Sequence, residues 1–430
     1  MHKFRLWAAL AACAIVAACG GGGGGGESTT PTQQNSSIQG STTITQVIAT
    51  PGSNAATITV AQAPAPSGVV VANVPMVSVV ICAPAQPTRC ATITNVQVDT
   101  GSSGFRVLKS VLDSAMSTWS TDLPAVKAPN GTDALGECMT FADGTAFGGI
   151  HKANLTVAGE TASSLNIEVI GDTATPQPTG TTGLCESLAN QAAPEDLHAN
   201  AVLGVGTAVD DCSFCHNGSN TTPMYFTCAS SCTRLTGVSL DATRLVGNPV
   251  AQFPVDNNGV IVELPAVAST GAPTATGVLV FGIGTQSNNA LGSAKVFGAD
   301  STYGYITTAL NGTSYPKSFF DSGSNSIFFP ASLTLCSGGT FYCPASPQQF
   351  TATLSGTNGI SGSLAFTVAN AQTLTNSGNF AFNDQAGSTS SFFSGSQTFD
   401  WGLPAFYGRN VYTAITGKNA GGTTGPYYAF

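Results

Sequence analysis

Two short segments of the sequence share a pattern of residues that could do acid–base chemistry. They are Asp99–Ser102, which reads Asp-Thr-Gly-Ser, and Asp321–Ser324, which reads Asp-Ser-Gly-Ser. A single such motif would be a plain turn, but each of these two directly follows an apolar run typical of a strand. Two carboxyl groups held about 3 Å apart cannot both ionise, so one can act as an acid while the other activates water. We therefore predict that Asp99 and Asp321 form a catalytic pair.

The other residues of the two motifs are suited to support this pair. In each motif the first hydroxyl can hydrogen-bond across to the opposite loop, and the glycine lets the backbone approach and present its N–H group. The final serine can orient the outer oxygen of the aspartate. The predicted supporting residues are Thr100, Gly101, Ser102, Ser322, Gly323 and Ser324.

Short β-type runs, broken by Gly, Pro, Asn and Ser, surround the motifs from Thr43 onward. Val77–Ile81 and Val278–Phe281 are apolar enough to be buried strands, and Leu165–Val169 alternates like a half-buried strand. A helix is expected after Phe105. No repeat of fixed length is evident, which argues against a propeller or a solenoid. The sequence therefore predicts an all-β fold of the barrel or sandwich type.

The composition excludes several classes of protein. Charged residues make up only 8% of the chain, and 13 Lys and Arg against 22 Asp and Glu give a net charge of −9, which argues against a nucleic-acid partner. Neither Gly204–Gly206 nor Gly282–Gly284 completes a dinucleotide motif, and no G-x-S-x-G serine hydrolase motif is found. We expect no cofactor and no metal, and we expect Asp210 and Asp211 to lie in a solvated loop.

The pattern of motifs resembles that of the pepsin-like aspartic peptidases over most of residues 70–430. Cys138–Gly149 resembles the flap hairpin of that family, with Phe141 and Gly144 near its turn. In the family each catalytic loop is closed by a hydrophobic-hydrophobic-Gly element. The residues that match these elements are Val202, Leu203 and Gly204 for the first loop, and Gly402 for the second. The pattern also resembles a group of bacterial lipoproteins of unassigned function.

The resemblance implies a bilobed, pepsin-like double β-barrel with pseudo-two-fold symmetry. The N-terminal lobe would span residues 45–255 and carry Asp99 and the flap, and the C-terminal lobe would span residues 256–430 and carry Asp321. Such a protein would be an aspartic endopeptidase that hydrolyses a peptide or protein substrate through the dyad and an activated water. We expect it to be a monomer.

Three positions depart from the pattern of the family and favour an alternative function. Phe141 stands where the flap usually has a tyrosine, Arg106 aligns near the tryptophan that partners this tyrosine, and Asp143 adds a negative charge to the flap. The alternative is a catalytically inactive pepsin-like lipoprotein that binds a peptide or protein. A purely structural surface protein is a third interpretation.

The N-terminus has the pattern of a targeting segment. Residues 1–18 carry basic residues followed by an apolar run, which is typical of a signal peptide. The run ends at Cys19 in a sequence that resembles a bacterial lipobox, which implies lipidation of Cys19; ordinary secretory cleavage nearby is the alternative. Residues 19–44 predict a flexible Gly/Ser/Thr tether. We therefore expect an exported protein, anchored by its lipid to the bacterial cell envelope, at the outer membrane.

Cysteine usage also indicates export. Twelve cysteines minus Cys13 and Cys19 leave ten, an even number that suggests five disulfides in an oxidising compartment. Proximity in sequence suggests three pairs, Cys82 with Cys90, Cys138 with Cys185, and Cys336 with Cys343. The other four have the spacing C-x2-C-x12-C-x3-C and could form two bridges among themselves or hold zinc; they are Cys212, Cys215, Cys228 and Cys232.

Overall fold

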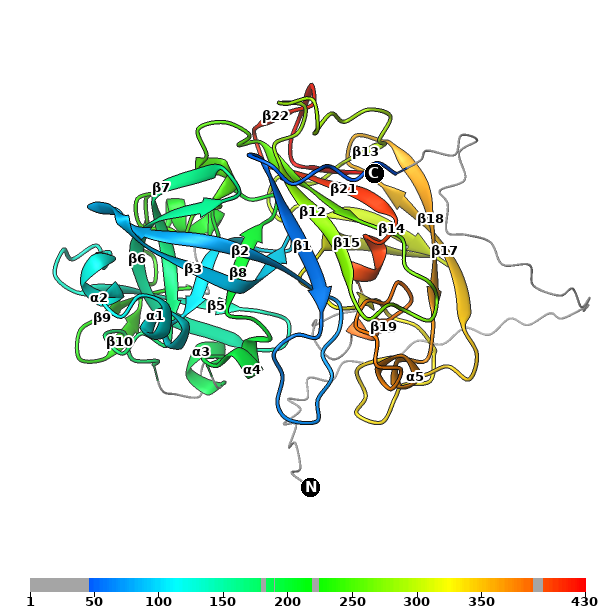
Figure 1. Ribbon diagram of the computed structural model, residues 1–430, viewed down its shortest axis with the longest axis horizontal. Helices are drawn as coiled ribbons and strands as arrows, with labels where there is room; N and C mark the ends of the chain where they lie inside the picture. The colour runs from blue at the N-terminus through cyan, green and yellow to red at the C-terminus, as the bar shows by residue number, and fades with distance from the viewer. Residues whose placement is uncertain (1–45, 179–182, 189, 219–223, 390–396) are drawn as a thin grey trace, which may run out of the picture. The chain divides into compact units, whose positions relative to one another are not determined.

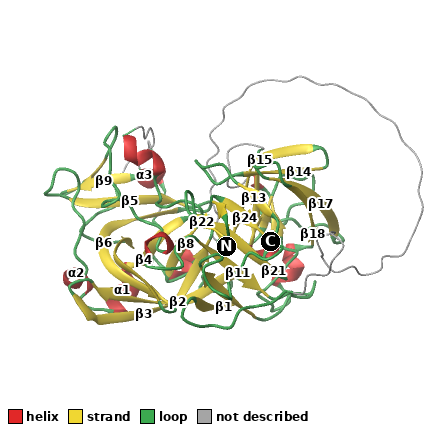
Figure 2. Ribbon diagram, turned by 90° about the horizontal axis from the view of Figure 1, so that it is seen from above, coloured by secondary structure: helices red, strands yellow, loops and turns green. Residues whose placement is uncertain are grey.

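The computed structural model describes residues 46–178, 183–188, 190–218, 224–389 and 397–430. The predicted signal peptide, Cys19 and the predicted tether lie outside these residues. Strands dominate the described chain, and Figure 2 shows that the helices between them are short. The expected all-β class is therefore confirmed. Within the described ranges, every helix is too short or too polar to span a membrane.

Most strands of the described residues belong to two sheets. The larger sheet contains β1 (Ala55–Ala61), β2 (Val74–Ala83), β3 (Gln86–Asp99), β4 (Ser103–Leu108), β5 (Ala134–Thr140), β6 (Thr145–Val157), β7 (Glu160–Ile170), β8 (Ala201–Val205), β9 (Tyr225–Cys228), β10 (Cys232–Arg234), β11 (Gly259–Leu264), β12 (Ala275–Phe281), β13 (Val296–Gly298), β21 (Arg409–Ala414) and β24 (Tyr427–Ala429). The second sheet contains β14 (Ile306–Leu310), β15 (Thr313–Asp321), β16 (Ile327–Phe328), β17 (Gln348–Ser355), β18 (Ser361–Val368), β19 (Ala386–Gly387) and β20 (Thr398–Gly402). β22 (Asn419–Ala420) and β23 (Thr423–Thr424) form a separate small ribbon.

The helices connect these strands. They are α1 (Lys109–Ala115), α2 (Trp119–Asp122), α3 (Leu184–Ser187), α4 (Pro194–Leu197) and α5 (Ala371–Thr375), with short 3-10 turns η1 (Ser213–Asn217), η2 (Val250–Gln252) and η4 (Leu403–Ala405). The helix expected after Phe105 is α1, although the strand continues to Leu108 before it begins.

The larger sheet joins the two halves of the chain. Its order runs from β3 through β2 and β1 to β12, β11 and β21, so strands from both halves are hydrogen-bonded side by side. In Figure 1, β1 and β12 lie between the strands of the first half and β14, β17 and β18 of the second half. The first motif follows β3 of this sheet, whereas the second motif follows β15 of the other sheet.

The same strand arrangement occurs around each aspartate. β3 runs parallel to β8 with Asp99 opposite Gly204, and β15 runs parallel to β20 with Asp321 opposite Gly402. After each motif the chain pairs antiparallel with that same neighbour, β4 with β8 and β16 with β20. Both aspartates therefore end strands that have a hydrogen-bonded neighbour on either side, so their backbone positions are fixed.

Apolar side chains fill the space behind both aspartates. Val96 and Val98 on β3 are fully buried, as is Phe320 directly before Asp321. The ring of Phe320 stacks at 6.0 Å from Trp401 on β20, whose ring centroid lies 4.4 Å from that of Phe399. Aromatic pairs of this kind contribute about 0.5–1.5 kcal/mol beyond the burial of their surface. The alternation of apolar residues seen in the sequence thus becomes the packed support of the two motifs.

Five disulfides join cysteines of the described chain. The pairs Cys82–Cys90, Cys138–Cys185 and Cys336–Cys343 form as the sequence predicts. Within the remaining quartet, Cys212 pairs with Cys215 and Cys228 pairs with Cys232. All four sulfur atoms of the quartet are occupied by these bonds, so the zinc alternative is wrong and the disulfide alternative is confirmed.

Glu263 connects the first described residues to β11. Its Oε2 accepts a hydrogen bond from Ala49 N at 2.6 Å, and its Oε1 accepts one from Asn410 Nδ2 at 3.1 Å. Burial raises the pKa of Glu263 from 4.5 to about 7. The folded state therefore favours the protonated acid, and the stability that this provides is present below pH 4.5 and lost as the pH rises through about 7.

Glu263→Gln should remove this pH dependence, because glutamine does not titrate. Between about pH 5 and about pH 8, the free energy of unfolding of the wild type should fall by up to about 3 kcal/mol more than that of the variant. Urea unfolding at several pH values measures this difference. Glu195→Gln, at an exposed position, should keep the slope of the wild type. Parallel pH curves for wild type and Glu263→Gln would contradict the prediction.

Candidate active site

The structure brings the carboxyl groups of the two motifs together. Asp99 ends β3, Asp321 ends β15, and each carboxyl group lies against the glycine of the opposite motif. A Cβ atom added to Gly101 would lie 2.5 Å from Cγ of Asp321, and one added to Gly323 would lie 2.7 Å from Oδ1 of Asp99. A side chain at either position would displace the opposite aspartate. The glycines are therefore required by the approach of the two loops.

Each aspartate accepts the same hydrogen bonds from its own motif. Gly101 N donates to Oδ1 of Asp99 at 2.8 Å, and Ser102 Oγ donates to Oδ2. In the second motif, the glycine N–H donates to Oδ1 of Asp321 at 2.7 Å, and the oxygen of the last serine lies 2.8 Å from Oδ2. The inner and outer oxygens of both carboxyl groups are thus held in equivalent ways.

Two hydroxyl groups cross-link the motifs. Ser322 Oγ accepts a hydrogen bond from Thr100 N at 3.1 Å and donates to Val98 O at 2.7 Å. Reciprocally, Thr100 Oγ1 accepts from Ser322 N at 2.9 Å and donates to Phe320 O at 3.0 Å. Both side chains are buried, so these bonds form out of water, where an unmade bond is costly. The hydroxyls lie where the sequence predicts them, and they fix the relative position of the two loops.

The environment of the pair favours a shared proton. Burial raises the pKa of Asp321 well above its usual range, and the negative charge of Asp99 and a hydrogen bond with Asp99 raise it further. The hydrogen bonds from the Ser324 hydroxyl and the Gly323 N–H oppose this rise only in part. A pair with one protonated and one ionised carboxyl can hold a water molecule and exchange a proton with it.

The predicted loop-closing residues lie beside the motifs. Val202, Leu203 and Gly204 belong to β8, where Leu203 pairs with Val98 of β3. A Cβ atom at Gly204 would lie 2.8 Å from Ser102 Oγ, which leaves room for no larger residue. Gly402 makes an equally close approach to the backbone of the second motif. These residues pack directly against the motif loops.

The predicted flap sequence forms a hairpin. β5 and β6 pair antiparallel, and at their turn Phe141 N donates a hydrogen bond to Gly144 O at 2.9 Å. Phe141 is partly buried against an apolar cluster that includes Leu108 and Val202. Asp143 is exposed and its Oδ1 lies 3.4 Å from Gln191 Nε2.

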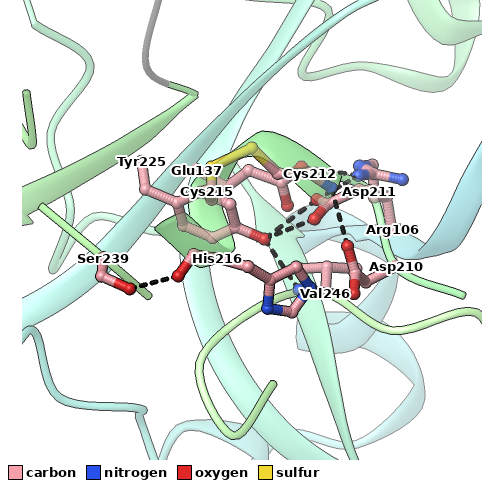
Figure 3. The surroundings of a disulfide bond; sticks show 10 residues. All are labelled: Arg106, Glu137, Asp210, Asp211, Cys212, Cys215, His216, Tyr225, Ser239 and Val246. Atoms are coloured by element: carbon pink, nitrogen blue, oxygen red, sulfur yellow. Dashed lines mark hydrogen bonds and ion pairs between the residues drawn. A yellow bond between two sulfur atoms is a disulfide. The ribbon is translucent and has the colours of Figure 1, made fainter. Parts of the chain in front are cut away.

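A buried cluster of charge, which the sequence did not predict, connects this hairpin to the first motif. Arg106 on β4 lies 2.5 Å from Glu137 of β5, 3.2 Å from Glu168 of β7 and 2.9 Å from Asp211. Tyr225 donates a further hydrogen bond to Asp211 at 2.8 Å. Figure 3 shows most of this cluster beside the Cys212–Cys215 disulfide. The strand that follows Asp99 is thus tied to the base of the hairpin.

One arginine cannot balance three ionised acids in this interior. Burial raises the pKa of both Glu168 and Asp211 well above the usual range, and the charge of Glu137 raises them further. The expectation of a solvated loop at Asp210 and Asp211 is wrong, because both side chains are buried. Asp210 instead pairs with His216 at 2.7 Å. The acids come from distant parts of the chain, so no local pattern in the sequence marks them.

Asp400 is a second acid that the sequence analysis missed. It lies on β20, is fully buried, and its Oδ2 is 2.6 Å from Ser324 Oγ of the second motif. It lies two residues before Gly402, which matches the second loop-closing element, but no pattern in the sequence marks this aspartate.

The fold and this site define a strand-rich protein in which two Asp-Xaa-Gly-Ser loops from different sheets hold a pair of carboxyl groups. Residues 50–430 match the model of a family described as "Protein of unknown function (DUF3443)", and the chain belongs to this family. A search of the curated proteins found no match.

Removing the hydroxyl cross-link should destabilise the protein. Thr100→Val and Ser322→Ala should each lower the free energy of unfolding by about 1–3 kcal/mol, because each leaves buried groups unpaired. The double variant should lose less than the sum, because the two hydroxyls bond to each other's loop. Urea unfolding measures these values, with Ser314→Ala at an exposed position of β15 as the control. Strict additivity of the two changes would count against a shared cross-link.

Removing Arg106 from the buried cluster should lower the free energy of unfolding more than removing the hydroxyl cross-link does. Arg106→Met leaves buried acids without their cation and should lower the free energy of unfolding by about 3–5 kcal/mol at neutral pH. The loss should shrink in acid, where the raised pKa values keep Glu168 and Asp211 neutral. Arg89→Met is the matched control, because Arg89 pairs with Asp122 but is 51% exposed and should cost at most about 1 kcal/mol. Equal losses for the two variants would contradict the prediction.

Proposed function

We propose that the protein is an aspartic endopeptidase, tethered to a membrane, that hydrolyses peptide bonds through the Asp99/Asp321 dyad and an activated water. The observation that carries the proposal is the reciprocal packing of each carboxyl group against the glycine of the opposite motif. The matching hydrogen bonds to both aspartates support it, because a dyad needs two equivalent carboxyls at close range. The finer fold proposed is the pepsin-like double β-barrel, with lobes at residues 45–255 and 256–430.

The proposed reaction divides the work between the two carboxyl groups. The ionised carboxyl removes a proton from the water as it attacks the peptide carbonyl, and the protonated carboxyl donates to the carbonyl oxygen. Gly101 N and Gly323 N hold the inner oxygens, and Ser102 and Ser324 hold the outer ones. This fixed geometry means that little reorganisation is needed when charge develops.

The second candidate is a pepsin-like lipoprotein that binds a peptide or protein without hydrolysis. Phe141 favours it, because this side chain packs against an apolar cluster and offers no hydroxyl near the turn of the hairpin. Arg106, which aligns near the expected tryptophan, is occupied by buried acids. The two candidates share a peptide partner and differ only in turnover.

The proposed location is the bacterial cell envelope, with the protein exported and anchored through a lipid on Cys19. Five disulfides among the described residues support an oxidising compartment, because such bonds persist outside the cytosol. We propose that the protein acts there as a monomer.

The test of hydrolysis is cleavage of a peptide library by the purified protein. The cleavage rate of the wild type should have a bell-shaped dependence on pH, with its maximum on the acid side. The rate falls when the pair gains a second proton and again when it loses its single proton. Asp99→Ala and Asp321→Asn should each lower kcat/KM by about 10³-fold or more, and pepstatin should inhibit the wild type. Asp113→Asn, outside the motifs, should cleave like the wild type. Absence of cleavage from about pH 3 to about pH 7 would overturn the peptidase and leave the binding protein.

A further inference from the structure

Asp400 occupies a position that the other half of the molecule fills with an apolar residue. In the second motif Asp400 lies two residues before Gly402, the residue paired with Asp321. In the first motif the corresponding residue is Val202, two residues before Gly204. The two halves match in their hydrogen bonds to the dyad and differ at this point. The buried acid is therefore an addition to a site that is otherwise duplicated.

The contacts of Ser324 require a proton on one of two carboxyl groups. Ser324 Oγ lies 2.8 Å from Oδ2 of Asp321 and 2.6 Å from Oδ2 of Asp400. A serine hydroxyl has one hydrogen, so it can donate to only one of these two oxygens. The other contact is a hydrogen bond only if that carboxyl is protonated and donates to Ser324 Oγ. With both acids ionised, one contact would bring two lone pairs together.

The surroundings indicate which acid carries this proton. Asp321 also accepts a hydrogen bond from Gly323 N, so its negative charge has a second donor. The side chain of Asp400 is fully buried, and its Oδ1 has no hydrogen-bond partner among the described residues. An ionised Asp400 would leave a buried charge with a single donor, which is costly. The neutral acid is the form of Asp400 that fits this position.

We propose that Asp400 is a positioning residue of the dyad: its carboxylic acid donates to Ser324 Oγ and so fixes the Ser324 hydroxyl as a donor to the outer oxygen of Asp321. The kinetic test of this inference rests on the proposed function. The contacts of Ser324 and Asp400 support the inference without it. Asp99 receives the same type of bond from Ser102, but within the described residues no hydrogen bond joins Ser102 Oγ to a second acid. The two successive hydrogen bonds, from Asp400 to Ser324 and from Ser324 to Asp321, are called the relay below. The relay gives Asp321 a donor of fixed direction.

The groups facing Asp400 set its response to pH. They are Asp321, Asp99 and Tyr428 of β24, and β16 and η4 bring only apolar residues to this strand. Burial raises the pKa of Asp400 well above its usual range, and the charges of Asp321 and Asp99 raise it further, whereas the Ser324 hydroxyl lowers it. As the pH rises through this raised pKa, Asp400 ionises and draws the Ser324 hydrogen to itself. Asp321 then loses its outer donor.

Two substitutions separate the hydrogen bond from the titration. Asp400→Asn keeps a donor toward Ser324 and cannot ionise, so it should retain kcat at the acid optimum and extend the alkaline limb of the profile. Asp400→Val copies Val202 and removes the donor, so kcat should fall about 10- to 100-fold with little change in KM. In a Ser324→Ala background Asp400→Val should have no further effect, whereas with Ser102→Ala the losses should add. Equal kinetics for wild type and Asp400→Val, or additivity with Ser324→Ala, would overturn the proposal.

A second measurement does not depend on cleavage. In protein labelled with ¹³C at the aspartate carboxyls, the Asp400 signal, assigned by its loss in Asp400→Asn, should keep the shift of a protonated acid at pH values where exposed aspartates are ionised. The pKa of Asp321 should rise in Asp400→Val and stay near the wild-type value in Asp400→Asn, because only the former loses the oriented donor. An Asp400 that titrates near 3.8 would overturn the relay, even in an active enzyme. If no peptide is cleaved but these shifts appear, the peptidase proposal fails and the relay stands.

Discussion

Two carboxyl groups repel each other once both are ionised, and the centre of this protein is organised to hold such a pair at close range. The loops can meet only because neither glycine has a side chain that would displace the opposite aspartate. The reciprocal hydrogen bonds of the Thr100 and Ser322 hydroxyls then hold the two loops together. Parallel pairing of β3 with β8 and of β15 with β20 brings each aspartate to the end of a supported strand. The apolar core packed behind these strands also helps to hold the two aspartates in place.

The sequence predicted the parts of this site that are local. Motif spacing, apolar runs and cysteine proximity are short-range patterns, and they yielded the dyad residues, the hairpin with Phe141 and Gly144, and the disulfides. The sequence did not predict contacts between residues far apart in the chain. Glu137 meets Arg106 only after β5, β6, β7 and β4 pair in that order, and Asp211 joins them from a loop. Asp400 reaches Ser324 only through the register of β20. Burial of a charged residue depends on tertiary contacts, which a local sequence pattern does not show. Asp210 and Asp211 were therefore wrongly predicted to lie in a solvated loop.

Buried acids recur through the described structure. Glu168, Asp211, Glu263 and Asp400 all have pKa values raised by burial. In a chain with only 22 acidic residues, this places a notable share of the titratable groups in the interior. At these four positions the folded protein retains protons that the unfolded chain has released at neutral pH, so each contributes stability that is lost as the pH rises through its raised pKa. The proposed aspartate dyad would likewise need a retained proton.

The reciprocal packing of the glycines has a consequence for how the sequence can change over time. A larger residue at Gly101 would harm the half of the molecule that carries Asp321, and a change at Gly323 would harm the half that carries Asp99. Which residues each half can accept at its motif glycine is therefore set by the aspartate of the other half. The positions one layer behind the two aspartates are free of this constraint, and there the halves differ, with valine at 202 and aspartate at 400.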